Sequence, residues 1–176
     1  MPHYRALALL AGLGTWIAAP VRAQTPDDPE SRLRTLGLTL PEASAPIANY
    51  VRAVRSGNLV FLAGHGECGA PLTGKVGRQV SIDSAYASAR RVGLCLLSSL
   101  KAEIGDLRKV KRVVRVFGMV NAAPDFVDHP RVINGCSDLL VAVFGERGRH
   151  ARAAVGMGSL PRGMSVEIEM VVEVEN

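Results

Sequence analysis

The spacing of hydrophobic positions changes along this chain, and the changes predict strands and helices. Two short β-type runs, Tyr50–Arg55 and Leu59–Ala63, flank Ser-Gly-Asn and predict a hairpin closed by a glycine-containing turn. The run Val110–Asn121 is rich in valine and predicts a long strand. Near the C-terminus, Val166–Glu175 alternates apolar residues with glutamates over most of its length, which is typical of a strand with one buried face.

Two segments repeat their apolar residues at helical spacing. Ser81 is suited to cap the first helix and Gly105 to end it, while the second begins at Asp128-His129-Pro130 and ends at Gly145. The apolar positions are Ile82, Ala85, Ala89, Val92, Leu96, Leu100 and Ile104 in the first segment, and Val132, Ile133, Cys136, Leu139, Leu140, Val143 and Phe144 in the second.

Two further β-type runs close the chain, one opened by Arg152 and one containing Glu167. Leu-Pro-Arg-Gly (Leu160–Gly163) separates them, and Pro with Gly between such runs is typical of a hairpin turn. We therefore expect Arg152 and Glu167 on adjacent strands of one hairpin. The element order is ββαβαββ, which predicts an α+β domain with two helices packed on one face of a mixed sheet.

The N-terminal segment has the features of a secretory signal peptide. Arg5 precedes the apolar run Ala6–Ala19, and Val21-Arg22-Ala23 offers small residues for cleavage after Ala23. The sequence thus predicts a signal peptide at residues 1–23 and a periplasmic or secreted protein, with an uncleaved membrane anchor as the alternative. After cleavage we expect no membrane partner. Residues 24–34 are expected to be a flexible N-terminus, and residues 35–176 the folded domain.

Composition restricts the class of protein. A length of 176 residues with 48% hydrophobic residues suits one globular domain and excludes a disordered chain. Removing residues 1–23 takes away two arginines and no acid, so the formal net charge falls from +5 to +3. The positive charges are spread along the chain, and aromatic residues make up 5% of it, so nothing predicts a nucleic-acid partner.

Three cysteines make an odd count without C-x-x-C spacing, so neither a metal site nor a redox pair is indicated, and no cofactor is expected. Cys95 and Cys136 fall within the helical patterns and are expected to be buried small hydrophobes. Cys68 lies in a glycine-rich loop and is the residue we expect to be a free thiol. In an oxidising compartment one pair could still form a disulfide.

Several motifs occur in the order found in one known family. The pattern R-x-x-V…LP-x-x-x-x-VEIE, from Arg152 to Glu169, resembles the C-terminal motif of the RidA family, also called YjgF or endoribonuclease L-PSP. Three other segments also resemble that family: NYVRAVRSGN (49–58, with Asn in place of the usual Pro), LAGH (62–65), and NAAPDF with DHPRVINGCSDLL (121–140). The resemblance covers residues 36–174. It implies the chorismate-mutase-like fold and a homotrimer with pockets at the subunit interfaces.

The resemblance also implies a site and a reaction. Arg152 would bind the carboxylate of a small substrate, for which a planar guanidinium is suited, and Glu167 would lie at the same pocket. The ring of Tyr50 would border that pocket, the amide of Gly64 would approach the carboxylate, and Asn134 would contact the site from the second helix. The implied reaction is hydrolysis of reactive 2-imino acids, formed from enamines, to 2-keto acids and ammonia.

The chain departs from the family pattern at three positions. Ala154 replaces a common Cys and Ala63 a common Ser, and His65 stands where Gln is common. His65 could supply an acid or base near neutral pH, or it could be a loop histidine with solvent contacts only.

Other interpretations of the same residues stay open. An arginine at a strand start and alternating glutamates are also typical of a solvated face. A non-catalytic module that binds small carboxylates is therefore the second hypothesis. A ribonuclease is a distant third, because it requires a basic patch with stacking aromatic residues and because export would separate the protein from RNA.

Overall fold

The computed structural model describes residues 28–43, 45–46 and 48–175; the predicted signal peptide and residues 24–27 lie outside the described part. Its helices and strands are α1 (Pro29–Thr35), β1 (Ala53–Ser56), β2 (Leu59–His65), α2 (Ile82–Ile104), β3 (Val110–Asn121), α3 (His129–Phe144), β4 (Ala151–Met157) and β5 (Val166–Val174). Short 3-10 turns occupy Leu107–Lys109, Gly145–Gly148 and Pro161–Gly163.

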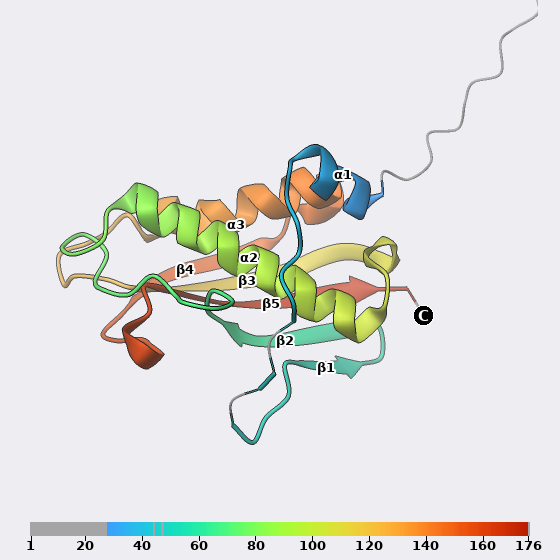
Figure 1. Ribbon diagram of the computed structural model, residues 1–176, viewed down its shortest axis with the longest axis horizontal. Coiled ribbons are helices and arrows are strands. Elements are labelled where there is room, and N and C mark those ends of the chain that lie inside the picture. The colour runs from blue at the N-terminus through green and yellow to red at the C-terminus, as the bar shows by residue number, and fades with distance from the viewer. Residues whose placement is uncertain (1–27, 44, 47, 176) are drawn as a thin grey trace, which may run out of the picture.

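The five strands form one mixed sheet in the order β1-β2-β5-β3-β4, and α2 and α3 lie side by side across one of its faces (Figure 1). All neighbouring strands are antiparallel except β3 and β4, which are parallel. The predicted α+β architecture is confirmed. Both long helices begin and end where the sequence indicated: the Ser81 hydroxyl accepts a hydrogen bond from Ser84 N at 3.1 Å, and Gly105 and Gly145 follow the two helices.

The predicted C-terminal hairpin is wrong. β3 lies between β4 and β5, pairing with β4 in parallel and with β5 in antiparallel orientation. The helix α3 connects β3 to β4 as a crossover, which makes those two strands parallel, and Leu160–Gly163 then carries the chain past β3 to the other side. The Pro and Gly residues correctly indicated a change of direction, but turn chemistry alone does not determine which strands pair.

The core lies between the sheet and the two long helices. Inward-facing side chains of the strands, such as Val60, Val116 and Ile168, are fully buried against apolar residues of α2 and α3. The two helices approach closely at Gly135, where a Cβ atom would overlap the backbone carbonyl of Tyr86. Within the described residues, no helix combines the length and hydrophobicity needed to cross a membrane.

The folded part begins earlier than the sequence indicated. The helix α1 starts at Pro29, its N-cap Asp28 accepts a hydrogen bond from Glu30 N at 3.2 Å, and Leu33 is only 3% exposed in the core. The segment 28–34 is therefore helical rather than unpacked. The sequence does not predict this helix, because one apolar residue among seven cannot show the spacing of a helix.

The expectation for Cys68 is also wrong. Cys68 forms a disulfide with Cys95, with their Cα atoms 5.9 Å apart, and this bond ties the loop after β2 to α2. The third cysteine, Cys136, is buried and unbonded, as expected, and burial raises its pKa to about 12. Two residues 27 positions apart were brought together by the packing of the loop on the helix, which sequence spacing cannot reveal.

Candidate functional site

Four of the six residues predicted for the site line one cavity of about 230 Å³ at the end of β2. These are Tyr50, Gly64, His65 and Glu167. The cavity is closed on one side by the loop after β2 and on another by the Pro161–Gly163 turn. The structure therefore brings these four predicted residues together around one cavity.

A bulge in β2 brings the backbone of Gly64 close to the carboxylate of Glu167. The pairing of β2 with β5 shifts between Leu62 and His65, so the strand carries an extra residue at this point. A Cβ atom on Gly64 would overlap Glu167 Oε1, which explains why this position is glycine. Burial raises the pKa of Glu167, and the neighbouring carboxylate of Glu169 raises it further.

His65 is held by hydrogen bonds at both ring nitrogens. Nδ1 lies 2.7 Å from the carbonyl oxygen of Ala63 and Nε2 lies 2.8 Å from the Ser99 hydroxyl on α2. A carbonyl can only accept, so Nδ1 carries the proton and Nε2 accepts from Ser99. The same hydroxyl accepts from Nη1 of Arg52 at 3.4 Å. His65 is therefore not a loop histidine with solvent contacts only, since it links β2 to α2, and burial lowers its pKa.

Glu67 also lines the cavity, but its carboxylate is already satisfied. Oε1 accepts from the Ser88 hydroxyl at 2.5 Å and from Leu72 N at 3.1 Å, and Oε2 pairs with Arg91. These bonds, the Arg91 guanidinium among them, hold the pKa of Glu67 below its usual range despite the opposing effect of burial. Glu67 therefore fixes the loop against α2 and remains negatively charged.

The other two predicted residues, Arg152 and Asn134, form a separate cluster on the helix-covered side of β4. Nη1 of Arg152 donates to Asn134 Oδ1 at 2.8 Å and to the Ser137 hydroxyl at 2.9 Å. Asn134 and Ser137 stand three residues apart on α3 and share one face of the helix. Among the described residues, Arg152 uses only Nη1, which leaves its Nε and Nη2 donors to bind a carboxylate side-on.

A histidine orients Ser137 in turn. His150 Nε2 lies 3.1 Å from the Ser137 hydroxyl, and His150 Nδ1 lies 2.7 Å from the carbonyl oxygen of Gly148. By the same reasoning as for His65, Nδ1 carries the proton and Ser137 donates to Nε2. Burial lowers the pKa of His150, and the nearby charge of Arg152 lowers it further.

The two clusters do not meet within one chain. Arg152 pairs with Val116, whose side chain points to the helices, whereas Glu167 pairs with Met119 on the opposite face of the sheet. The strand β3 stands between them. The expectation that both residues would meet across one hairpin is therefore wrong, because it depended on the incorrect strand pairing.

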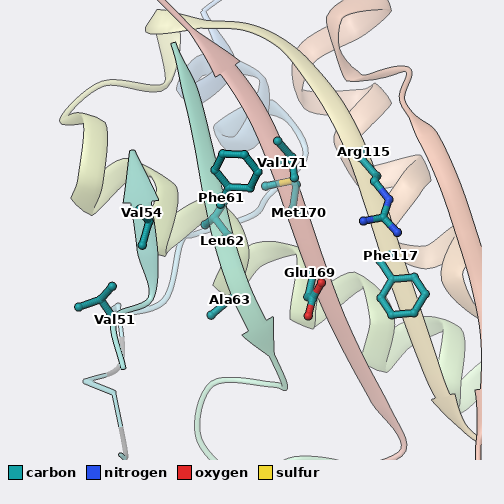
Figure 2. A pocket seen from close by; sticks show the side chains of 10 residues that line it. All are labelled: Val51, Val54, Phe61, Leu62, Ala63, Arg115, Phe117, Glu169, Met170 and Val171. Carbon is teal, nitrogen blue, oxygen red and sulfur yellow. The ribbon is translucent and has the colours of Figure 1, made fainter. Parts of the chain in front are cut away.

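The face of the sheet away from the helices is hollowed and rich in apolar side chains. A cavity of about 340 Å³ lies over β1, β2, β5 and β3, and Figure 2 shows Phe61, Phe117 and Val171 lining it beside Arg115 and Glu169. Phe61 is 45% exposed. Apolar side chains gathered on an exposed face are typical of surfaces that contact another protein.

Sequence reasoning missed Arg52, Ser99, Ser137, His150 and Arg162. One signal was available: Ser137 follows Asn134 by three residues on a predicted helix, which places both on one face. The Arg52 and Ser99 positions depend on packing between β1, β2 and α2. Within the described residues, no group of three or more His, Cys, Asp or Glu side chains is placed to hold a metal ion.

A family profile and a curated protein both match most of this chain. The profile of the family described as "YjgF/chorismate_mutase-like, putative endoribonuclease" matches residues 30–171. The chain is 42% identical over 150 residues to Protein TCP17 of Trypanosoma cruzi, covering 83% of this chain and 94% of that protein.

Solved structures extend the comparison. The protein Atu1372 from Agrobacterium tumefaciens, of unknown function, is 44% identical with a TM-score of 0.78, covering 86% of this chain and 94% of that one. A "putative endoribonuclease" from Shewanella oneidensis is 30% identical with a TM-score of 0.82, covering 84% and 100%. RidA from an Antarctic Psychrobacter is 26% identical with a TM-score of 0.53, covering 76% and 94%.

Proposed function

Because the chain belongs to the YjgF/chorismate-mutase-like family, we propose that it hydrolyses 2-imino acids to 2-keto acids and ammonia. The observation that carries the proposal is a pair of incomplete half-sites on opposite sides of the sheet. One contains Arg152, which is suited to bind a carboxylate, and the other contains Glu167, whose carboxylate lies against Gly64. Each half has one of the two functions that the reaction needs. We call them the Arg152 half-site (Arg152, Asn134, Ser137, His150) and the Glu167 half-site (Tyr50, Gly64, His65, Glu167).

A homotrimer would join the two halves. In a cyclic assembly every interface presents one surface of a subunit to a different surface of its neighbour, so one Arg152 half-site can face one Glu167 half-site at each interface. The exposed apolar face around Phe61, Phe117 and Val171 supports this arrangement, because such a face is expected to be covered by another protein surface.

In the joined site the arginine holds the substrate. The Nε and Nη2 donors of Arg152 bind the carboxylate with two parallel, charge-assisted hydrogen bonds, while Asn134 and Ser137 keep the guanidinium in place through Nη1. The Gly64 amide adds a donor to the same carboxylate, and the Glu167 side chain lies against the Cα of this glycine. The imine carbon is thereby fixed opposite Glu167.

Glu167 orients the attacking water. Its raised pKa makes its carboxylate a stronger hydrogen-bond acceptor and base than an exposed glutamate. The oxygen of the water bonds to the imine carbon and one of its protons passes to the nitrogen, which gives a carbinolamine. The remaining hydroxyl proton then also passes to the nitrogen as the C=O bond forms. The C–N bond then breaks, releasing ammonia and leaving a 2-keto acid. Because such imines already hydrolyse in water, positioning of the two reactants is sufficient.

His65 has a positioning role in this scheme. Its ring nitrogens are occupied by Ala63 and Ser99, and it fixes the bulge that contains Gly64. The positions of Ala63 and Ala154 provide no hydroxyl or thiol, so Glu167 is the acceptor assigned to the water.

An oxidising compartment is consistent with the chain. The Cys68–Cys95 disulfide supports it, because such bonds persist mainly in exported proteins, and so does the N-terminal pattern of a signal peptide. We propose a periplasmic or secreted location for the mature protein. N-terminal sequencing of the exported protein tests this: Gln24 as first residue supports it, and retention of Met1 in the cytoplasm contradicts it.

The test of the reaction is the lifetime of an imine. An amino-acid oxidase generates 2-imino acids, semicarbazide traps those that remain, and the rate of loss is compared for wild type, Arg152→Ala and Arg149→Ala. The last variant removes an exposed arginine whose ion pair is with Glu146, and serves as the charge-matched control.

We expect wild type and Arg149→Ala to accelerate imine loss, and Arg152→Ala to lower kcat/KM about 10- to 100-fold, as for a lost charged hydrogen-bond pair. If wild type binds 2-keto acids but leaves imine lifetimes unchanged, the deaminase proposal is wrong and a non-catalytic carboxylate-binding module takes its place.

A further inference from the structure

The cavity around the Glu167 half-site is lined by two arginines that the proposed hydrolysis does not use. Arg52 and Arg162 both line its cavity. Among the described residues neither makes an ion pair, and Glu67, an acid on the same wall, is already paired with Arg91. Glu167 lines the same cavity, and within the described residues no ion pair joins it to either arginine. The cavity therefore holds two guanidinium groups that no carboxylate of the described chain pairs with.

Arg52 is oriented in the same manner as Arg152. In each case Nη1 donates to a serine on a helix, that serine donates to a histidine Nε2, and the histidine Nδ1 donates to the carbonyl two residues before it. The chain thus contains two Arg-Ser-His relays of one design, Arg52–Ser99–His65 and Arg152–Ser137–His150. Like Arg152, Arg52 keeps Nε and Nη2 without a partner in the described chain, and this is the edge that binds a carboxylate side-on.

Arg162 is held at the cavity by its backbone. It adopts φ +56°, a left-handed conformation that is uncommon for a residue with a side chain. The turn that carries it is fixed on both sides, since Gly163 O accepts from Gly74 N at 2.9 Å and Lys75 Nζ donates to Gly158 O at 2.8 Å. No hydrogen bond holds the Arg162 guanidinium within the described residues. A fixed backbone with an unengaged cation is consistent with a ligand contact.

We propose that Arg52 and Arg162 form a second anion site, and that the preferred ligands of this protein are small dicarboxylates: 2-imino acids derived from acidic amino acids and the corresponding 2-keto dicarboxylates. This inference rests on the proposed function, in which Arg152 takes the carboxylate next to the imine. The second carboxylate, at the far end of the ligand, lies against Arg52 and Arg162. A monocarboxylate leaves those two cations without a partner.

The test compares ligands of equal chemistry and different charge. Isothermal titration calorimetry on the mature chain measures the Kd of two monocarboxylates, pyruvate and 2-oxobutyrate, and of two dicarboxylates, oxaloacetate and 2-oxoglutarate. The variants are Arg162→Gln, Arg52→Lys and Arg52→Gln. Arg78→Gln removes one positive charge from a different surface and is the matched control.

We expect wild type and Arg78→Gln to bind the dicarboxylates about tenfold more tightly, one charged hydrogen-bond pair being worth about that factor. Arg162→Gln and Arg52→Gln lose most of this preference and keep the affinity for monocarboxylates, whereas Arg52→Lys keeps part of it. Circular dichroism establishes that each variant is folded, and Arg162→Gln alters no hydrogen bond of the described chain.

Two results overturn the inference. If wild type binds both ligand classes equally, the second anion site does not exist while the proposed function stands. If Arg78→Gln loses the preference as fully as Arg162→Gln, the effect is one of net charge and not of a site. Failure of every keto acid to bind wild type contradicts the proposed function itself and removes this inference with it.

Discussion

The two Arg-Ser-His relays show how one local design serves two different surroundings. The Arg152 relay lies on the edge strand β4 against α3, where its arginine is exposed and supported by a second acceptor, Asn134. The Arg52 relay lies at the end of β2 against α2, where its arginine is partly buried and borders a cavity that also contains Glu167. The first presents a single anchor at a surface, and the second lines a cavity.

The proposed reaction uses both clusters, and neither cluster supplies both functions. The Arg152 half-site has a rigid cation but no acid to direct water, and the Glu167 half-site has the acid but lacks Arg152, from which β3 and the plane of the sheet separate it. In the proposed trimer, a neighbouring subunit that packs on the exposed face in Figure 2 would supply what is missing. The most informative experiments therefore separate the two halves.

The largest effect is expected from Phe61→Glu, which places a charge on the exposed sheet face. We expect the proposed trimer to dissociate and kcat/KM to fall at least about 100-fold, because each half-site would lose its partner. Light scattering measures the mass and the imine assay measures the rate. Val127→Glu is the control, because Val127 is an apolar residue that is 79% exposed and lies away from this face. This variant should remain trimeric and active. A monomeric Phe61→Glu protein with full activity would show that the halves do not need each other.

The next effect concerns the Glu167 half-site alone. The double variant Cys68→Ser/Cys95→Ala removes the bond that ties the cavity loop to α2, and we expect the free energy of unfolding to fall by about 3 to 4 kcal/mol for a 27-residue separation. Urea unfolding monitored by circular dichroism measures it. Wild type in reductant should unfold like the variant. If the variant is much less stable than reduced wild type, the loss of unfolding free energy comes from the packing of Cys95 and not from the disulfide.

The smallest effect concerns the Arg152 half-site alone. Burial lowers the pKa of His150 below 6.5, so in the folded protein the ring is neutral near pH 7, and the stability that it contributes is lost as the pH falls from 6.5 through this lower pKa. A protonated ring cannot accept from Ser137, and it adds a positive charge beside Arg152. We expect KM for 2-imino acids to rise a few-fold on acidification, with kcat less affected, and His150→Gln to flatten this dependence. An unchanged pH profile in the variant would remove His150 from the account.

The fold was largely predictable because its signals are local. The helix at Ile82–Ile104 has a serine cap, a glycine stop and seven apolar positions at helical spacing, and it occurs where the pattern indicated. The pairing of β4 and β5 was not predictable in this way, since alternation specifies a face of a strand but not its neighbour. The disulfide between Cys68 and Cys95 likewise depends on distance in space.

The candidate site likewise contains residues that motifs predicted and residues that only the packing of the chain brings into place. Tyr50, Gly64, His65 and Glu167 were found from motifs, and they lie around one cavity. The partners that orient the arginines are serines on helices, Ser99 and Ser137; the spacing from Asn134 could have indicated Ser137, whereas nothing in the sequence distinguishes Ser99 from other helix serines. Arg162 stood in the predicted turn, and its left-handed backbone appeared only in three dimensions.

The most direct test of the account is subunit complementation. Arg152→Ala and Glu167→Gln are each expected to be inactive in the imine assay, and the two are unfolded together, mixed in equal amounts and refolded. If the halves come from neighbouring subunits of a cyclic trimer, about one quarter of the interfaces receive an intact Arg152 from one subunit and an intact Glu167 from the next, and about one quarter of wild-type activity returns. A mixture of trimers that stays as inactive as its parents would show that Arg152 and Glu167 do not act across a subunit interface.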